Sequence, residues 1–421
     1  MAGFPSRATL PYAGSEWAAE ARRIGEYLQG CVRRATDGSL VWLKPPRPDR
    51  EAAGPLSLGP HLYAGCVGVA LFLAALGYVQ DDAPMRDLAA RTLGPLRRRL
   101  VATIAAERSG QESGLRLGGL LGIGGLVYSF VRIAGWLDDT ALIAEAAELA
   151  TLIHPDRIAA DENLEVMYGS AGAIFGLLAL DAAVPGAMVD GLSPLARAVL
   201  CGEHLLCSRT VFATAAGERA CSWPARGGAP LSGFAHGASG VAAALARLAE
   251  RTGRADFLAA ALEGAVFEST CYAPERRNWR ASASPDSSMM TAWCNGAPGI
   301  ALARLRLAAA VGGGDRRIGD ELEVALATTH EAPPTGYDFV CCGAMGCSEI
   351  LLEAGLALDR PDLVAKAEQL AAGVVARAAL REHPPSHPHY NPGFFRGAAG
   401  IGYALLRLDH PADLPCVLAL D

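Results

Sequence analysis

Apolar runs recur along the chain, and each begins at a Gly-x-x-Gly tetrapeptide. The runs are apolar on nearly every side, which is typical of helices buried on all faces. Between them lie amphipathic stretches such as TALIAEAAELATLI, whose apolar residues recur with the helical period. The tetrapeptides are GCVG at 65, GIGG at 122, GSAG at 169, GASG at 237, GAPG at 296, GAMG at 343 and GAAG at 397. This pattern predicts alternating inner and outer helices.

The spacing of the tetrapeptides predicts a repeat architecture. Successive starts lie 47 to 68 residues apart, which leaves room for two helices and two connections. Seven such pairs can close into an all-α double seven-helix α/α toroid, with the glycine motifs gathered at one end. Strand signals are few. On the glycines alone, an open α-solenoid used as a scaffold is the alternative.

We expect a single domain over residues 1–421. Its lead-in segment covers 1–55, and the seven-repeat toroid covers 56–421. Two Pro-rich stretches, 45–60 and 382–393, have the composition of loops rather than of domain linkers. No convincing domain boundary follows from either of them.

Composition narrows the class of protein. The chain has 421 residues, of which 51% are hydrophobic, and its formal net charge is −7. The first two values exclude a disordered chain, and the acidic balance disfavours a nucleic-acid partner. Lysine occurs only at 44 and 366 while arginine is plentiful, a bias that suggests a GC-rich, bacterial genome.

The cysteines and the first residues of the sequence predict a cytoplasmic protein. Eleven cysteines in a chain this long do not form a disulfide scaffold, and the odd count leaves at least one thiol unpaired. The start MAGFPSRATLPYAGSEW lacks the basic and apolar regions of a signal peptide. The longest apolar runs, 64–79 and 117–131, are shorter than the roughly 20 residues of a membrane span. We therefore expect no membrane span.

Four reactive side chains lie next to the glycine motifs. His236 directly precedes the fourth motif, Cys294 lies two residues before the fifth, and Cys341 and Cys342 directly precede the sixth. Thiolate and imidazole are ligands of zinc, so convergence at one end of a toroid would create a metal site. Taken one by one, each residue also has an ordinary interpretation, a core cysteine or a histidine at a helix start.

Several segments resemble the lanthionine synthetase C-like cyclases. They are HLYAGCVGVALFL, AHGASG, NW, WCNGAPGIALARL, CCGAMG and NPGFFRGAAGIGYALLRL, and together they span nearly the whole chain. The closing DLPCVLALD is similar to the end of class II (LanM-type) lanthipeptide synthetases. The chain thus looks like their C-terminal cyclase domain without the dehydratase domain that normally precedes it.

The resemblance implies a double α-toroid with a central zinc ion. Family members add the Cys thiols of a dehydrated precursor peptide to dehydroalanine or dehydrobutyrine, which forms (methyl)lanthionine thioether rings. Carried over residue by residue, Cys294, Cys341 and Cys342 are the Zn²⁺ ligands, with Cys342 where many members have His, and His236 is the catalytic acid or base. The implied partners are the precursor peptide and a separate or fused dehydratase.

Glu165 is the second catalytic candidate that the resemblance implies. It lies four residues before the third motif, where the family usually has Asp, and a carboxylate beside an imidazole favours the protonated ring. The alternative is a solvated acid in the loop DENLEV. We expect the neighbouring Asp161 and Glu162 to matter little. Met290 and Asn295 stand where stand-alone family members often carry Arg and Tyr.

Two rival functions remain open at this point. One is a helical toroid that binds peptide, or serves as a scaffold, without catalysis. The other is a zinc-dependent thiol transferase of the protein prenyltransferase type, which is also an α/α toroid that activates a peptide thiol. The chain shows no Asp-x-Cys ligand motif of that class, and its repeat count does not fit.

Overall fold

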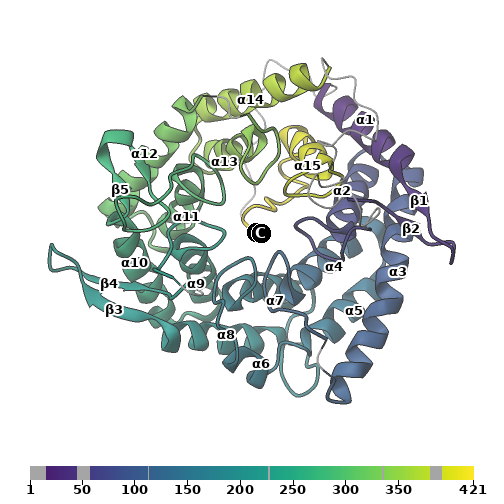
Figure 1. The fold of residues 1–421 in the computed structure, drawn as a ribbon, viewed down its shortest axis with the longest axis horizontal. Helices are drawn as coiled ribbons and strands as arrows, with labels where there is room; N and C mark the ends of the chain where they lie inside the picture. Colours follow the sequence, from purple (N-terminus) through teal and green to yellow (C-terminus); the bar gives the residue numbers. More distant parts are fainter. Residues whose placement is uncertain (1–15, 45–56, 112, 226–227, 334–335, 380–390) are drawn as a thin grey trace.

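The computed structural model describes residues 16–44, 57–111, 113–225, 228–333, 336–379 and 391–421. Within these ranges the chain forms two concentric rings of helices (Figure 1). The predicted all-α toroid is confirmed. Of the predicted lead-in segment, residues 1–15 and 45–55 lie outside the described ranges.

The inner ring consists of the helices that follow the seven glycine motifs. They are α2 (Cys66–Val79), α4 (Ile123–Leu137), α7 (Ser170–Ala183), α9 (Ala238–Thr252), α11 (Ala297–Ala310), α13 (Ala344–Ala357) and α15 (Ala398–Asp409). Each packs against the next, and α15 packs back against α2. The ring is therefore closed, which excludes an open solenoid.

The outer ring covers the inner one helix by helix. Its helices are α1 (Glu16–Cys31), α3 (Ala83–Arg108), α5 (Thr140–Ala150), α8 (Pro194–Ser208), α10 (Ala255–Ser269), α12 (Arg316–Glu331) and α14 (Pro361–Ala379), with the short α6 (Pro155–Ala159) before α8. Each pairs with one inner helix, and α1 pairs with α15. Residues 16–31 of the lead-in segment thus supply the outer helix of the seventh pair.

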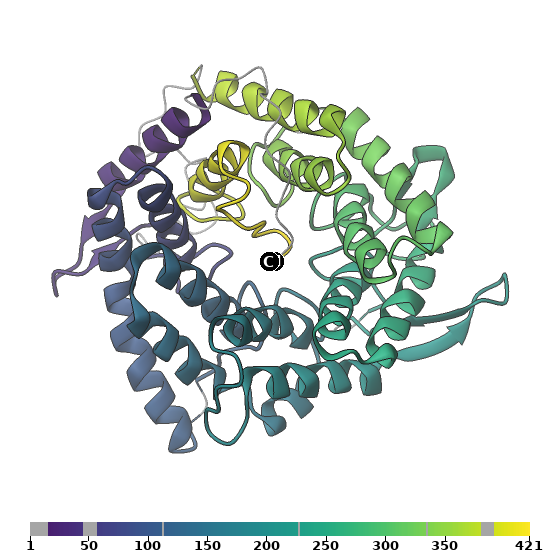
Figure 2. The ribbon, with the colours of Figure 1, turned by 180° about the vertical axis from the view of Figure 1, so that it is seen from behind.

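Three two-stranded antiparallel hairpins decorate the described part of the ring. They pair β1 (Arg33–Arg34) with β2 (Leu40–Val41), β3 (Thr210–Ala213) with β4 (Arg219–Ser222), and β5 (Tyr272–Ala273) with β6 (Asn278–Trp279). The β3–β4 hairpin projects outward from the ring (Figures 1 and 2). Most of these strands are too short to show alternation of apolar and polar residues, so they were not predictable from the sequence.

The glycine motifs form one repeated turn. The first glycine of each motif is the N-cap of its inner helix and offers no side-chain cap. In six repeats a backbone N–H at the start of the inner helix donates to a carbonyl seven residues earlier, as Ala238 does to Leu231. The donor is the first residue of the helix, except in the third repeat, where it is the second. A Cβ on the second glycine would overlap that loop, and at Gly240 it would meet the carbonyl oxygen of Phe234. Both glycines are therefore required by close backbone contact.

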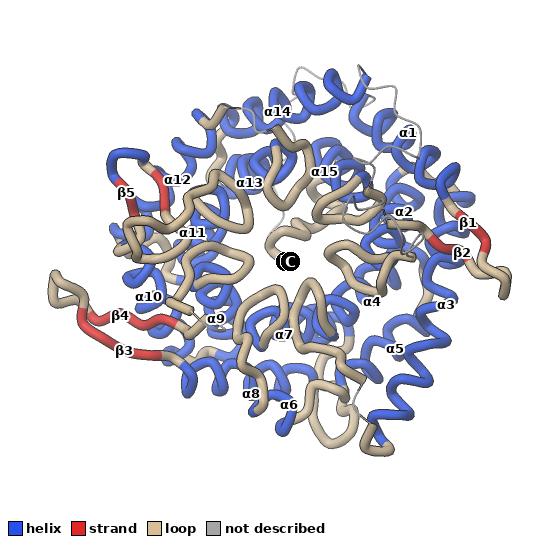
Figure 3. Tube along the Cα trace, in the orientation of Figure 1, coloured by secondary structure: helices blue, strands red, loops and turns tan. Residues whose placement is uncertain are grey.

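The turns bring the loops before the inner helices to one end of the ring. Figure 3 shows these loops around its centre. Adjacent loops are joined by backbone hydrogen bonds between residues two positions before the motif: the Tyr63 N–H donates to the Leu120 carbonyl, and the Cys341 N–H donates to Phe395. Residues at this position consequently face one another across neighbouring repeats.

The last residues of the sequence occupy the middle of the toroid. The chain end lies near the centre in both views of the ribbon (Figures 1 and 2). Residues 414 and 416–420 are buried. The Asp421 carboxylate forms ion pairs with Arg247 of α9 and Arg306 of α11, and Arg306 also pairs with Glu353 of α13. This segment ties several inner helices together from inside.

Candidate metal centre

Three cysteine thiols meet where the loops of the fifth and sixth repeats come together. The sulfur atoms of Cys294, Cys341 and Cys342 all lie within 4.8 Å of one another. Three thiolates around a tetrahedral zinc, each about 2.3 Å from the metal, would be separated by about 3.8 Å. The described geometry therefore brings together the predicted ligands, and their soft sulfur donors fit zinc.

The two loops that carry the cysteines are built differently. The sixth repeat has the common turn, in which the Ala344 N–H donates to the Tyr337 carbonyl. The fifth repeat replaces that carbonyl with the side chain of Asn278, whose Oδ1 accepts from the Ala297 N–H at 2.8 Å. Gly296 there has a φ of 96°, a conformation that favours glycine. This altered turn sets the backbone position of Cys294, two residues before Gly296.

Hydrogen bonding among the thiols redistributes their protons. Hydrogen bonds with Cys294 and Cys341, together with the guanidinium of Arg396, lower the pKa of Cys342 to about 3. Hydrogen bonding with Cys294 and Cys342 raises the pKa of Cys341. A thiolate is thus available at neutral pH for binding a cation.

Tyr63 reaches the same cluster from the first repeat, and no pattern in the sequence singled it out. Its hydroxyl donates to the Cys341 sulfur at 3.1 Å. Burial raises the pKa of the Tyr63 phenol, so the hydroxyl keeps its proton. Its ring stacks on Phe395 with centroids 5.2 Å apart, and Phe395 packs in turn on Trp293. Aromatic rings therefore support the cluster.

A histidine and a carboxylate pair in the loops of the third and fourth repeats. His236 Nδ1 lies 3.0 Å from Glu165 Oε2, and the His236 side chain is 48% exposed. The ring also stacks loosely on Tyr168, with centroids 6.2 Å apart. With Nδ1 directed at the carboxylate, Nε2 is the nitrogen left to exchange a proton with a ligand.

Glu165 also holds its own loop. Its carboxylate accepts hydrogen bonds from the N–H groups of Met167 and Tyr168 at 2.8 and 3.0 Å. The residue is only 9% exposed. The interpretation of Glu165 as a solvated acid is therefore wrong, although its catalytic role stays a prediction.

Asp161 is not a solvated acid either. Its carboxylate accepts from the backbone N–H and the hydroxyl of Ser170, both at 2.7 Å, and from the Leu164 N–H. Because the N-cap of α7 is a glycine, Asp161 supplies the missing cap from outside the motif. Asp161 therefore has a structural role that its place in the loop did not indicate, whereas Glu162 is exposed. The small effect expected of replacing either residue stays a prediction.

A similar external cap supports the loop of His236. The buried carboxylate of Glu268 accepts from the N–H groups of Gly233 and Ser239, each at 2.9 Å, and pairs with Arg304. No motif links Glu268 to the fourth repeat, so its role could not be predicted from the sequence.

Met290 and Asn295 take no direct part in the pairings of the cluster. The Met290 side chain is exposed, and its carbonyl accepts from the Asn278 amide. The Asn295 amide donates to the Ser232 carbonyl at 3.3 Å, which joins the fourth and fifth loops.

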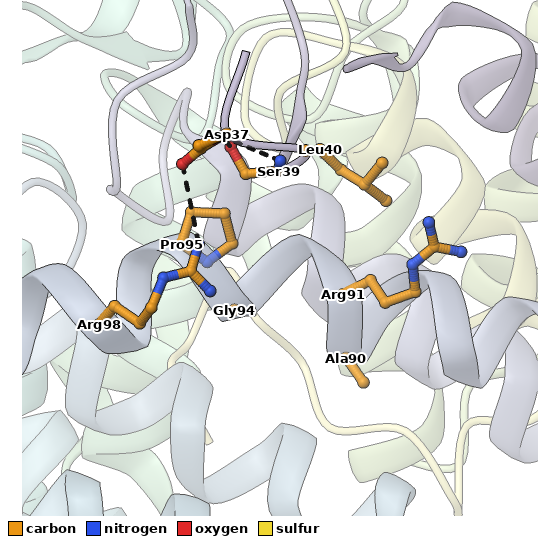
Figure 4. Close-up of a pocket in the computed structure, with 9 residues that line it drawn as sticks. Asp37, Ser39, Leu40, Ala90, Arg91, Gly94, Pro95 and Arg98 are labelled. Carbon is orange, nitrogen blue, oxygen red and sulfur yellow. Dashed lines mark hydrogen bonds and ion pairs between the residues drawn. The ribbon is translucent and has the colours of Figure 1, made fainter. Parts of the chain in front are cut away.

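The site lies away from the groove drawn in Figure 4. That groove is between the β1–β2 turn and α3, on the outer ring, and is lined by residues such as Asp37 and Arg98.

Every cysteine in the chain is free. Among the described residues, none of the helices combines the length and the apolar character that crossing a bilayer requires.

The fold and the site define a closed α/α toroid with a tris-cysteine cluster and a His–Glu pair at one end. The sequence model of the lanthionine synthetase C-like proteins matches residues 57–419. The chain belongs to that family, which confirms the resemblance seen in the sequence.

Comparison with solved structures supports the fold. The chain is similar to nisin cyclase, with a TM-score of 0.61 and 17% identity over 86% of this chain and 91% of the other. A cellobiose 2-epimerase from Bacillus thermoamylovorans B4167 has a TM-score of 0.48 and 9% identity over 94% and 99% of the two chains. None of the curated proteins compared with the chain matches it.

Proposed function

We propose that this protein is a zinc-dependent lanthipeptide cyclase. Its substrate is a dehydrated precursor peptide that contains Cys and either dehydroalanine or dehydrobutyrine. The reaction is an intramolecular Michael-type addition that forms a lanthionine or methyllanthionine ring. The observation that carries the proposal is the cluster of Cys294, Cys341 and Cys342 at the same end of the toroid as the His236–Glu165 pair.

The three cysteines would hold the zinc ion. When bound, zinc supplies the positive charge that keeps a peptide thiol in its nucleophilic thiolate form near neutral pH. Three protein thiols leave one position of a tetrahedral site for the substrate, which is the arrangement of catalytic rather than structural zinc sites. Backbone hydrogen bonds between the loops of neighbouring repeats hold the cysteines in place before substrate arrives.

His236 moves the proton that completes the addition. The peptide thiol gives up its proton, its sulfur forms a bond to the β-carbon, the π bond of the dehydro residue breaks, and the electron pair passes to an enolate. Protonation of the α-carbon by His236 gives the thioether, so the peptide's mass does not change. General acid catalysis of this type contributes about 10²–10⁴-fold. The 48% exposure of His236 leaves its ring accessible to the peptide.

Glu165 positions that histidine. Its carboxylate is fixed by two backbone N–H groups and faces His236 Nδ1, which orients the ring. We further propose that the protein acts in the cytoplasm of a bacterium, downstream of a separate or fused dehydratase. The reaction requires that class of enzyme because it consumes dehydrated residues.

A peptide with one cysteine and one dehydroalanine tests the proposal. After incubation with the zinc-loaded protein, a thiol alkylating agent is added and the peptide is weighed by mass spectrometry. We expect the fraction of alkylated peptide to fall with time. The peptide that escapes alkylation should have the same mass as the starting peptide. Full alkylation throughout would contradict the cyclase and favour a peptide-binding scaffold. A mass gain from an isoprenoid donor would instead indicate a thiol transferase.

A further inference from the structure

Tyr63 is a polar side chain at the metal centre that the proposed reaction does not use. It comes from the first repeat, 278 positions away from Cys341, yet its hydroxyl donates to the Cys341 sulfur at 3.1 Å. It stands two residues before its glycine motif, as Cys294 and Cys341 do in theirs. The toroid therefore places the phenol at a position equivalent to that of two ligands.

Contacts with Phe395 hold this phenol in place. The Tyr63 carbonyl accepts from the Phe395 N–H, and the Phe395 carbonyl accepts from the Cys341 N–H, both at 2.9 Å. The Tyr63 and Phe395 rings are nearly parallel, with an interplanar angle of 14°. Phe395 thus connects Tyr63 to Cys341 through its backbone and through its ring, so the hydroxyl is directed at the sulfur.

We propose that Tyr63 is a positioning residue that tunes the metal centre through its hydrogen bond to the Cys341 sulfur. The inference rests on the proposed function, because it assumes a metal on the three thiols. Three thiolates bring more negative charge than one divalent ion neutralises. A hydrogen bond to one of them draws electron density from that sulfur, and such outer partners adjust both the orientation and the donor strength of a ligand.

Cobalt(II) makes this tuning visible without any measurement of activity. Metal-stripped wild type and Tyr63→Phe are each loaded with Co²⁺, and the sulfur-to-cobalt charge-transfer absorption is recorded. Loss of the hydrogen bond raises the energy of the sulfur lone pair, so we expect the band of Tyr63→Phe to shift to longer wavelength. Competition with a chelator should show about 10–100-fold weaker metal binding, the usual cost of losing an outer partner.

Tyr403→Phe is the matched control. The Tyr403 hydroxyl donates to the Pro415 carbonyl at 2.8 Å inside the toroid, so this variant also loses one hydrogen bond but none to sulfur. We expect its band to stay at the wild-type wavelength. Incorporation of 3-fluorotyrosine, a stronger donor, should shift the wild-type band to shorter wavelength, and this measurement serves if Tyr63→Phe does not fold.

The outcomes distinguish failure of the proposed role of Tyr63 from failure of the proposed metal centre. An unchanged band and unchanged affinity in Tyr63→Phe overturn the role of Tyr63 while leaving the metal site intact. An unchanged band after fluorotyrosine incorporation overturns it as well. Failure of the wild type itself to bind cobalt overturns the proposed metal centre instead.

Discussion

At the scale of single residues, the site contains two separate groups of side chains, the three thiols and the histidine–carboxylate pair. The sulfurs of Cys294, Cys341 and Cys342 lie within 4.8 Å of one another, whereas His236 pairs with Glu165. The sequence placed all five beside glycine motifs. Tyr63 was not predictable, because a tyrosine before a glycine motif becomes informative only when the ring closes and lets its hydroxyl reach Cys341 of the sixth repeat past the seventh.

Zinc stoichiometry tests the three ligands. We expect one zinc per chain in wild type and less than a tenth of that in Cys294→Ala after exposure to a chelator, because two thiols hold the ion much more weakly than three. Cys342→His should retain zinc, since imidazole is also a zinc ligand. Elemental analysis of the purified proteins gives the ratio. Zinc that stays bound in Cys294→Ala would place the metal elsewhere.

Replacement of His236 tests its assignment to chemistry. His236→Ala should keep one zinc per chain and a wild-type circular dichroism spectrum, because the side chain is half exposed. Ring formation should slow by about 10²–10⁴-fold, the usual contribution of a general acid or base. Thiol alkylation of the peptide over time measures the rate. Loss of zinc together with activity would show that His236 is a ligand.

Replacement of Glu165 should affect both the rate and the stability. Glu165→Gln removes one acceptor from a carboxylate that serves two N–H groups and His236. We expect slower cyclisation, unchanged zinc content and a free energy of unfolding lower by about 1 kcal/mol. Kinetics and thermal denaturation measure the two effects. The exposed Glu162→Gln is the control, and equal small effects from both would remove Glu165 from the catalytic machinery.

At the scale of elements, the glycine motif explains why the inner ring was predictable. A glycine N-cap, a second glycine beneath the preceding loop and an apolar run define each inner helix locally. The caps of α7 and α9 were not predictable, because Asp161 and Glu268 lie outside the motifs. Likewise, Asn278 replaces the usual carbonyl at α11 through a contact across 19 residues.

Two glycine substitutions test this account of the turn. Gly172→Ala should destabilise the protein by about 3 kcal/mol, because the new Cβ would overlap the Val166 carbonyl and the backbone of Gly119. Gly135→Ala, on the exposed side of α4 with no atom within 4 Å of the new Cβ, should stabilise it by about 0.5–1 kcal/mol. Denaturant unfolding measures both. Similar effects at the two positions would refute the close-contact explanation.

At the scale of the whole molecule, the sequence predicted a closed toroid but not what fills it. Closure follows from the contact of α15 with α2, and the final segment runs inward from α15 and ends near the centre (Figure 1). The Trp293 indole donates to the Leu418 carbonyl at 3.0 Å, so this segment also supports the residue next to Cys294. These contacts join distant parts of the chain and leave no local pattern.

Asp421 should contribute to stability through its two arginines. Asp421→Asn removes the charge that compensates Arg247 and Arg306, both of which are more than half buried. We expect the free energy of unfolding to fall by about 1–3 kcal/mol, with zinc content unchanged. Asp413→Asn, whose side chain is 54% exposed, is the control. An unfolding curve identical to that of wild type would show that the ion pairs are not needed to hold the ring.

A zinc titration tests the proposed metal centre and its reaction together. Metal-stripped protein receives increasing zinc, and the rate of thiol loss from the dehydrated peptide is measured at each step. We expect a rate that rises in proportion to zinc and reaches a plateau at one ion per chain, with no rise in Cys294→Ala. A rate that is independent of zinc, or that rises equally in Cys294→Ala, would contradict this proposal.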